Sequence, residues 1–287
     1  MAKINPNVGL SHADLQCTHW STGQVSPVLG HDGMPHIVDY VSAIGMGKVQ
    51  YHVPFYMLGY NPDLLTVRED ICEWGGTYIR PPDTGIQMLL KSTSDQDKAG
   101  GTGVSSVSIS YLDASFNEIT ISLATNGITG VLTPPVNITR INFFNSNAGA
   151  VNANGEIEAV GNITLKNTGE TVTYAQITAT NNVSRHGIFT IPNGMVGYLT
   201  GGYISCGGTS VGRFVRAMLR ATCDRTGTTL TPNLFQFKRQ LLMMDAAAPT
   251  KFEMPVRVPA RCDIKYSAID ENGSYVACFV EGFYEPI

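Results

Sequence analysis

Histidines crowd the start of the chain, where imidazoles beside acidic side chains could bind a metal ion. Five of the six histidines, with one cysteine and three aspartates, lie in the first 52 residues: His12, Asp14, Cys17, His19, His31, Asp32, His36, Asp39 and His52. Metal sites usually take their ligands at characteristic spacings, and neither H-x-x-x-H nor a cysteine pair occurs here. We therefore expect these side chains to make polar contacts, and we expect no metal and no cofactor.

Other residues with catalytic potential are scattered along the chain. Gly45-Met46-Gly47 precedes a lysine, but the spacing of a phosphate-binding loop is absent. Glu156 and Glu158 could share a strand face and divide acid and base roles, although surface charges that keep a sheet soluble are the simpler interpretation. Neither G-x-S-x-G nor H-E-x-x-H occurs. The sequence therefore predicts no catalytic residues and a protein that is not an enzyme.

Two groups of residues have the character of contact surfaces. The segment VQYHVPFYMLGYNPDLL is aromatic, and its prolines rule out a regular helix. An exposed patch of this kind would promote aggregation, so we expect subunit contacts from Tyr51, Phe55, Tyr56, Met57, Leu58 and Tyr60. Further along, Arg213, Arg216 and Arg220 could form a basic strip for acidic partners, or simply a solvated face. Their segment, GRFVRAMLRATC, fits a helix or a strand, and its bracketing glycines favour a strand.

The elements that must position these residues belong to a globular protein. The chain has 287 residues, 43% hydrophobic and 15% charged, with a net charge of -4. This composition suffices for a substantial core and does not favour nucleic acid as a partner. No apolar run is long enough for a membrane helix, and the start does not resemble a secretory signal, so we expect a soluble protein made in a cytosol. We also expect its six cysteines to be reduced.

Alternation of apolar and polar residues predicts an all-β fold. In TGVSSVSISYLDASFNEITISLATNG, residues 102–127, the pattern indicates a hairpin with one buried face and one polar face. Similar segments recur every 8 to 12 residues to the end of the chain, as in a sandwich or barrel. We expect an extended arm over residues 1–48, an antiparallel sandwich over 49–158, and a jelly-roll-like sandwich over 159–287.

Several segments resemble a family of structural proteins of tailed bacteriophages. They are GYNPDLLTVREDICEWGGTYI, STSDQDKAGGTGVSSVSISYLDASFNEITISLATNG, RHGIFTIPNGMVGYLTGGYISCGG and PVRVPARCDIKYSA. The likeness spans roughly residues 55–287, and the first 50 residues depart most from it. The family supplies no catalytic residues to compare.

The resemblance implies a non-enzymatic part of a virion, assembled in the host cytoplasm. Its place would be that of a capsid decoration or cement protein, a vertex-associated component, or a neck or tail component. The expected partners are further copies, most simply a homotrimer, and other virion proteins such as the major capsid, neck or tail proteins. The alternative is a host-receptor module of a fibre, with loops around Tyr198, Tyr203, Tyr275 and Tyr284 binding a glycan or protein.

Overall fold

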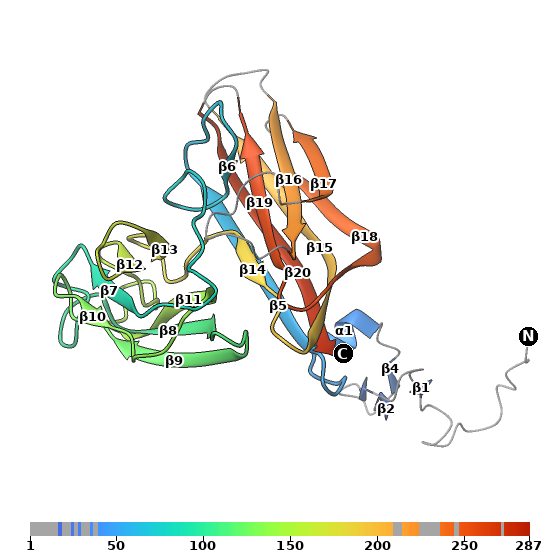
Figure 1. The fold of residues 1–287 in the computed structure, drawn as a ribbon, viewed down its shortest axis with the longest axis horizontal. Coiled ribbons are helices and arrows are strands. Elements are labelled where there is room, and N and C mark those ends of the chain that lie inside the picture. The colour runs from blue at the N-terminus through green and yellow to red at the C-terminus, as the bar shows by residue number, and fades with distance from the viewer. Residues whose placement is uncertain are drawn as a thin grey trace, which may run out of the picture.

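The computed structural model describes residues 40–208, 214–223, 236–243, 247–270 and 273–287, and the bounds of four short strands before them. Those short strands form two antiparallel pairs: β1 (Cys17–Thr18) with β2 (Gln24–Val25), and β3 (Val28–Leu29) with β4 (Pro35–His36). Apart from the short helix α1 (Tyr40–Gly45), the regular elements in the rest of the described chain are strands, and they form two sandwiches that lie side by side (Figure 1). The predicted all-β fold with antiparallel sheets is confirmed.

The smaller sandwich packs a four-stranded sheet against a three-stranded one. The first sheet has the order β10-β7-β12-β13, from β7 (Met88–Ser92), β10 (Val131–Leu132), β12 (Ile163–Asn167) and β13 (Thr173–Ile177). The second has the order β11-β8-β9, from β8 (Val104–Leu112), β9 (Glu118–Ala124) and β11 (Arg140–Gly149). β8 and β9 are the predicted hairpin, and Val107 and Ile109 of its buried face lie in the core with Phe144 of β11.

The larger sandwich is a jelly roll. One sheet has the order β18-β15-β20-β5, from β5 (Val53–Asn61), β15 (Met195–Gly207), β18 (Ala247–Val258) and β20 (Tyr275–Pro286). The other has the order β14-β19-β16-β17, from β14 (Ile188–Thr190), β16 (Val215–Thr222), β17 (Gln236–Met243) and β19 (Asp263–Ile269). The short β6 (Glu69–Asp70) also pairs with β19.

The strand order identifies this topology. β5 is the first strand of the roll, and β14 to β20 are its second to eighth strands. In this numbering one sheet has the order 1-8-3-6, and the other has the order 2-7-4-5. Two sheets interleaved in this way are the double Greek key of a jelly roll. The smaller sandwich is inserted between the first and second strands of the roll. Its chain leaves after β6 and returns at β14.

The expected domain boundary at residue 158 is therefore wrong. β12 and β13 lie beyond it but pair within the smaller sandwich, through the β12 contact with β7. β5 lies before it but pairs with β20 near the end of the chain. The physical reason is that strand pairing follows the burial of apolar faces in space, and an inserted domain separates neighbours by more than a hundred residues.

The last part of the expected arm belongs to the jelly roll. Helix α1 (Tyr40–Gly45) buries Ala43 and Ile44 against Phe283 of β20, and Val49 completes this small cluster. In Figure 1, α1 lies at the end of the roll, beside the C-terminus. The arm as predicted, residues 1–48, is thus too long, because residues 40–48 pack on the core of their own domain.

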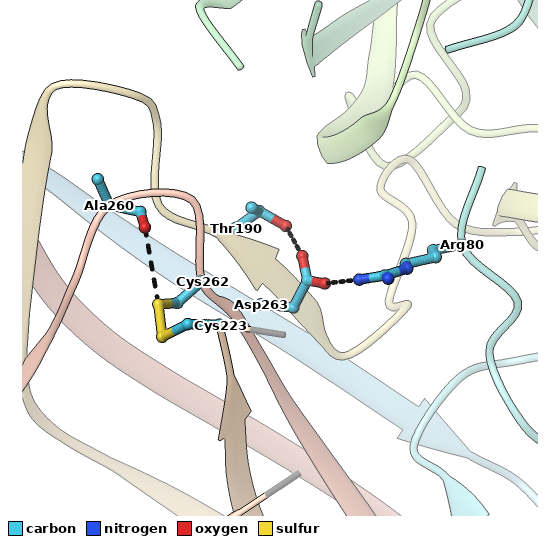
Figure 2. Close-up of a disulfide and its surroundings, with 6 residues drawn as sticks. All are labelled: Arg80, Thr190, Cys223, Ala260, Cys262 and Asp263. Carbon is cyan, nitrogen blue, oxygen red and sulfur yellow. Dashed lines mark hydrogen bonds and ion pairs between the residues drawn. A yellow bond between two sulfur atoms is a disulfide. The ribbon is translucent and has the colours of Figure 1, made fainter. Parts of the chain in front are cut away.

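The segment GRFVRAMLRATC contains a strand, as predicted, but the expectation for the cysteines needs a correction. Cys72, Cys206 and Cys278 are buried free thiols. Cys223 and Cys262, however, form a disulfide (Figure 2). Thr222 of β16 and Asp263 of β19 are paired residues, so the cysteines just beyond them face each other across neighbouring strands, with Cα atoms 4.2 Å apart.

Candidate interaction surface

The predicted contact segment is strand β5, and its residues alternate between the core and the outer face of the sheet. Phe55 and Met57 are buried in the jelly-roll core, so these two cannot contact another subunit. Tyr56, Leu58 and Tyr60 point to the opposite face, because successive side chains of a strand alternate. Tyr51, before the strand, is 69% exposed. The structure therefore leaves four of the six predicted residues accessible.

A stack of aromatic rings crosses the outer face of this sheet. Phe279 of β20 lies between Tyr203 of β15 and Tyr56 of β5, with ring centroids 5.7 Å and 6.3 Å away. The rings are nearly parallel, at interplanar angles of 23° and 20°. Tyr56 and Tyr203 are 45% and 47% exposed, respectively. An exposed aromatic row on a rigid sheet has the character of a contact surface.

Beyond Tyr56, a groove separates the two sandwiches. It has a volume of about 540 Å³ and is lined by Pro54, Tyr56, Leu58, Phe143, Asn145, Ser146, Asn182 and Val183. One wall comes from β5 of the jelly roll and the other from β11 of the smaller sandwich. The Phe143 ring lies 5.2 Å from that of Tyr56. Sequence reasoning missed Phe143, although in RINFFNSN two consecutive phenylalanines on a strand must point to opposite faces.

The linking segment, residues 182–187, connects the two walls of the groove and is held by backbone hydrogen bonds. At one end, Ser146 donates its amide to the Asn182 carbonyl (2.7 Å) and Ser184 donates to Phe144 (2.8 Å). At the other end, Gly187 donates to Leu58 (2.7 Å). Gly187 has a φ of 60°, and a Cβ there would lie 2.2 Å from the Ile71 carbonyl oxygen. Only glycine allows this close approach, so the groove is bounded by a fixed segment.

The two sandwiches meet at a buried ionic cluster around Asp263 of β19. Arg140 of β11 donates through Nε to Asp263 (2.8 Å), and Arg80 donates through Nη1 (3.1 Å). Thr190 of β14 donates its hydroxyl to the same carboxylate (2.7 Å). Arg140 also reaches Asp83 (3.0 Å). Figure 2 shows Arg80 and Thr190 converging on Asp263 beside the disulfide.

The electrostatics of this cluster favour its charged form. Burial alone would raise the pKa of Asp263, but the charge and hydrogen bonds of Arg140, together with Thr190 and Arg80, outweigh burial and lower it. Both carboxylate oxygens have cationic partners, which is what a charge needs in a protein interior. The cluster thus joins β11 of the smaller sandwich to β19 of the roll.

Neutral hydrogen bonds strengthen this joint. Asn142 donates to the Thr190 carbonyl (3.0 Å) and accepts from the Thr190 amide (2.9 Å), as a neighbouring strand would. His186 is buried between the domains, with Nδ1 3.1 Å from the Ser184 hydroxyl and Nε2 3.1 Å from the Ile141 carbonyl. Burial lowers the pKa of His186 to about 4, so it is neutral near pH 7. These contacts fix one sandwich against the other.

The predicted basic strip is not an exposed strip. Arg216 is exposed, whereas Arg220 is buried, and Arg213 lies outside the described residues. Arg220 and Lys265 are paired residues on β16 and β19, and Lys265 donates to Asp70 of β6 (2.8 Å). β6 pairs with β19, and its Asp70 brings a carboxylate to this part of the sheet from a distant part of the sequence, which no local pattern in GRFVRAMLRATC could indicate.

The tyrosines of the alternative receptor site lie on strands and not on loops. Tyr198 and Tyr203 belong to β15, and Tyr275 and Tyr284 to β20. Tyr284 is buried and donates its hydroxyl to Glu118 (2.5 Å), so it is another contact between the sandwiches. Burial raises its pKa. Tyr203 and Tyr275 remain exposed on the outer face.

The residues with catalytic potential do not come together. His52 contacts Tyr40 (2.6 Å) and Glu285 (2.5 Å), while the side chains of the other four N-terminal histidines lie outside the described residues. Glu158 accepts from Asn152 (2.9 Å). Across the described part of the chain, no three His, Cys, Asp or Glu side chains lie close enough to hold a metal ion. No helix in that part has the length and apolar character of a membrane crossing.

Asn61, Glu69 and Asp70 accept hydrogen bonds that hold the segment before the smaller sandwich. Glu69 accepts from the amides of Leu65 (3.1 Å) and Gly76 (2.9 Å), and Asp70 accepts from the Tyr78 amide (2.8 Å) and the Ser267 hydroxyl (2.8 Å). Asn61 accepts from the Asp63 amide (3.0 Å), which closes an Asx turn. This segment is therefore fastened to the sheet by its own side chains.

Comparison with known proteins does not assign a family. No family model and no curated protein matches the chain. Among solved structures, a match is the 2.6 Å structure of T=1 particles derived from infectious bursal virus, at 11% sequence identity, over 88% of this chain and 80% of that chain. Its TM-score is 0.20, which does not establish a shared fold.

Proposed function

We propose that the chain is a non-enzymatic structural protein of a tailed-phage virion. The supporting observation is a jelly roll that carries a second sandwich between its first two strands, joined by buried ionic contacts. Jelly rolls serve as building blocks of viral capsids, among other uses. The resemblance of residues 55–287 to phage structural proteins supports the same function.

Within the virion, the proposed position is on the capsid as a decoration, cement or vertex-associated component, or in the neck or tail. The contact surface is the outer face of the sheet β18-β15-β20-β5, around Tyr203, Phe279 and Tyr275. Exposed aromatic side chains of this kind are enriched at protein interfaces. The partners would be further copies, as a trimer, and neighbouring capsid, neck or tail proteins.

Imaging of virions tests this proposal. Phage carrying a small epitope tag at the C-terminus of this chain is purified, labelled with gold-conjugated antibody and examined by electron microscopy. We expect gold on the virion, at the capsid, a vertex, the neck or the tail. Purified virions that contain none of the protein, by labelling and by mass spectrometry, would contradict the proposal. Untagged phage is the control.

A further inference from the structure

The groove between the sandwiches has walls of two different chemistries. Pro54, Tyr56, Leu58 and Phe143 give it rings and aliphatic surface. Asn145, Ser146 and Asn182 supply amides and a hydroxyl on the side formed by β11 and the linking segment. None of the eight lining residues is charged. An occupant must therefore have an apolar face and a rim of neutral hydrogen-bonding groups.

We propose that this groove binds a neutral carbohydrate chain. A pyranose ring presents C–H groups on one face, which pack well on an aromatic ring, and hydroxyls around its edge, which both donate and accept hydrogen bonds. An asparagine amide matches such hydroxyls because it offers two donors and one acceptor. The groove volume of about 540 Å³ lies within the range of small-molecule sites, roughly 300–1,000 Å³.

Tyr56 is placed to supply the aromatic surface. It is the last ring of the row Tyr203–Phe279–Tyr56, on the edge strand β5 that borders the groove. One face of its ring stacks on Phe279, and Phe143 lies on the groove side. Because stacking on Phe279 already fixes the orientation of the Tyr56 ring, the Tyr56 side chain loses little conformational entropy when a ligand packs against it.

The polar wall is fixed as well. Asn145 donates from Nδ2 to the Ser146 carbonyl (3.1 Å), which orients its amide. The backbone of Asn182 accepts from the Ser146 amide (2.7 Å), while its side chain is exposed. The joint around Asp263 holds the two walls at a fixed separation. A site arranged in advance binds more tightly than one that must be ordered by its ligand.

Charge argues for a neutral glycan over an anionic one. Phosphate and carboxylate ligands are normally bound by arginine or lysine, and the lining contains neither. The nearest cation along the linking segment, Arg185, is paired with Glu73 (2.7 Å from Nε) and lies 4.3 Å from the centre of the Tyr60 ring. An acidic polysaccharide would find no partner for its charges in this groove.

The test measures binding of the purified full-length protein to bacterial polysaccharides. The probes are immobilised capsular and O-antigen polysaccharides, one set neutral and one set acidic, with affinity measured by biolayer interferometry. We expect binding to members of the neutral set. Tyr56→Ala and Asn182→Ala should each weaken it by about tenfold or more, since each removes a principal contact. Phe214→Ala is the matched control, because Phe214 is an aromatic residue that is 52% exposed but does not line the groove.

Three outcomes would overturn the proposal: no binding to any neutral polysaccharide, binding that both groove variants retain, or binding confined to the acidic set. Circular dichroism of each variant checks that the fold is intact. The proposal does not depend on the place of the protein in a virion. Gold labelling on virions together with an absence of glycan binding would contradict this inference and leave the proposed function intact. Glycan binding by a protein that is absent from virions would contradict only the proposed function.

Discussion

Asp263 is buried at the meeting point of three strands and two arginines. Its partners come from distant parts of the sequence: Arg80 before the smaller sandwich, Arg140 within it and Thr190 after it. Removing one partner of a buried ion pair is costly because the other charge remains in a medium of low polarity. This residue therefore bears on the stability of both domains.

We expect Asp263→Ala to lower the free energy of unfolding by about 3–5 kcal/mol, measured by urea denaturation. The control is Asp95→Ala, which removes an exposed pair with Lys98 (2.6 Å) and should cost at most about 1 kcal/mol. If Asp263→Ala yields no folded protein, Thr190→Val removes one hydrogen bond to the same carboxylate and should cost about 1–2 kcal/mol. Equal, small effects of the Asp263 and Asp95 variants would refute this account.

His186 makes stability depend on pH. The folded protein keeps this imidazole neutral down to a pKa of about 4, whereas in the unfolded chain the pKa is about 6.5. As pH falls below about 6.5, the unfolded chain therefore takes up the proton first, and stability decreases towards pH 4. The contribution of this group is fully present above about pH 6.5.

Relative to His186→Gln, the wild-type protein should lose up to about 3 kcal/mol of unfolding free energy between pH 7 and pH 4. Glutamine can keep a neutral donor near the Ile141 carbonyl and does not titrate in this range. Urea denaturation at a series of pH values measures the difference between the two proteins. Parallel pH profiles would show that His186 does not contribute.

At the scale of elements, α1 is short but it covers an end of the core. Six residues cannot form a stable helix alone, so its stability must come from packing. Ala43 and Ile44 supply that packing on Phe283, and Tyr40 contacts the same ring edge-on at 6.1 Å. The helix therefore belongs to the jelly roll and not to an independent arm.

Two truncations separate the helix from the residues before it. Deleting residues 1–48 should lower the free energy of unfolding by about 2–4 kcal/mol relative to deleting residues 1–39, since only the longer deletion exposes Phe283. Thermal and urea denaturation of the two proteins measure this difference. Equal stability would mean that α1 adds nothing to the core. The intact chain is the reference for both.

At the scale of the whole molecule, the two sandwiches form a body with a groove between them and an aromatic face next to that groove. The contacts of Asp263, Asn142 and Tyr284 each join the jelly roll to the inserted domain. Buried ionic and hydrogen-bonded contacts limit rotation between domains, in contrast to a flexible linker. The aromatic face is thus presented by a rigid support.

We expect the protein to self-associate at micromolar concentration, as a trimer, and Tyr203→Lys to raise the dissociation constant by about tenfold or more. A lysine at this end of the aromatic row would place a charge in the contact surface. Val151→Lys, at an exposed site on the smaller sandwich, is the control and should leave association unchanged. Sedimentation equilibrium over a range of concentrations measures both. A wild-type monomer throughout that range would contradict self-association.

The sequence by itself determined the class of fold. Alternation in segments such as residues 102–127 identified strands and their buried faces, because side chains on a strand alternate with a period of two whatever the neighbours are. The same rule puts Phe55 and Met57 on the face opposite Tyr56. The prediction of all six residues as one contact patch did not take this alternation into account. The exposed Tyr56 was predicted as a contact residue, and it lines the groove.

Only the tertiary structure decided which strands are neighbours and which charges are buried. Alternation reports the face of a strand and not its partner, so the pairing of β5 with β20, and the inserted domain between β5 and β14, could not be inferred locally. Arg140 and Asp263 belong to residue types that usually lie at the surface. They are buried because segments far away in the sequence cover them and supply opposite charges, and that cover exists only in the folded chain.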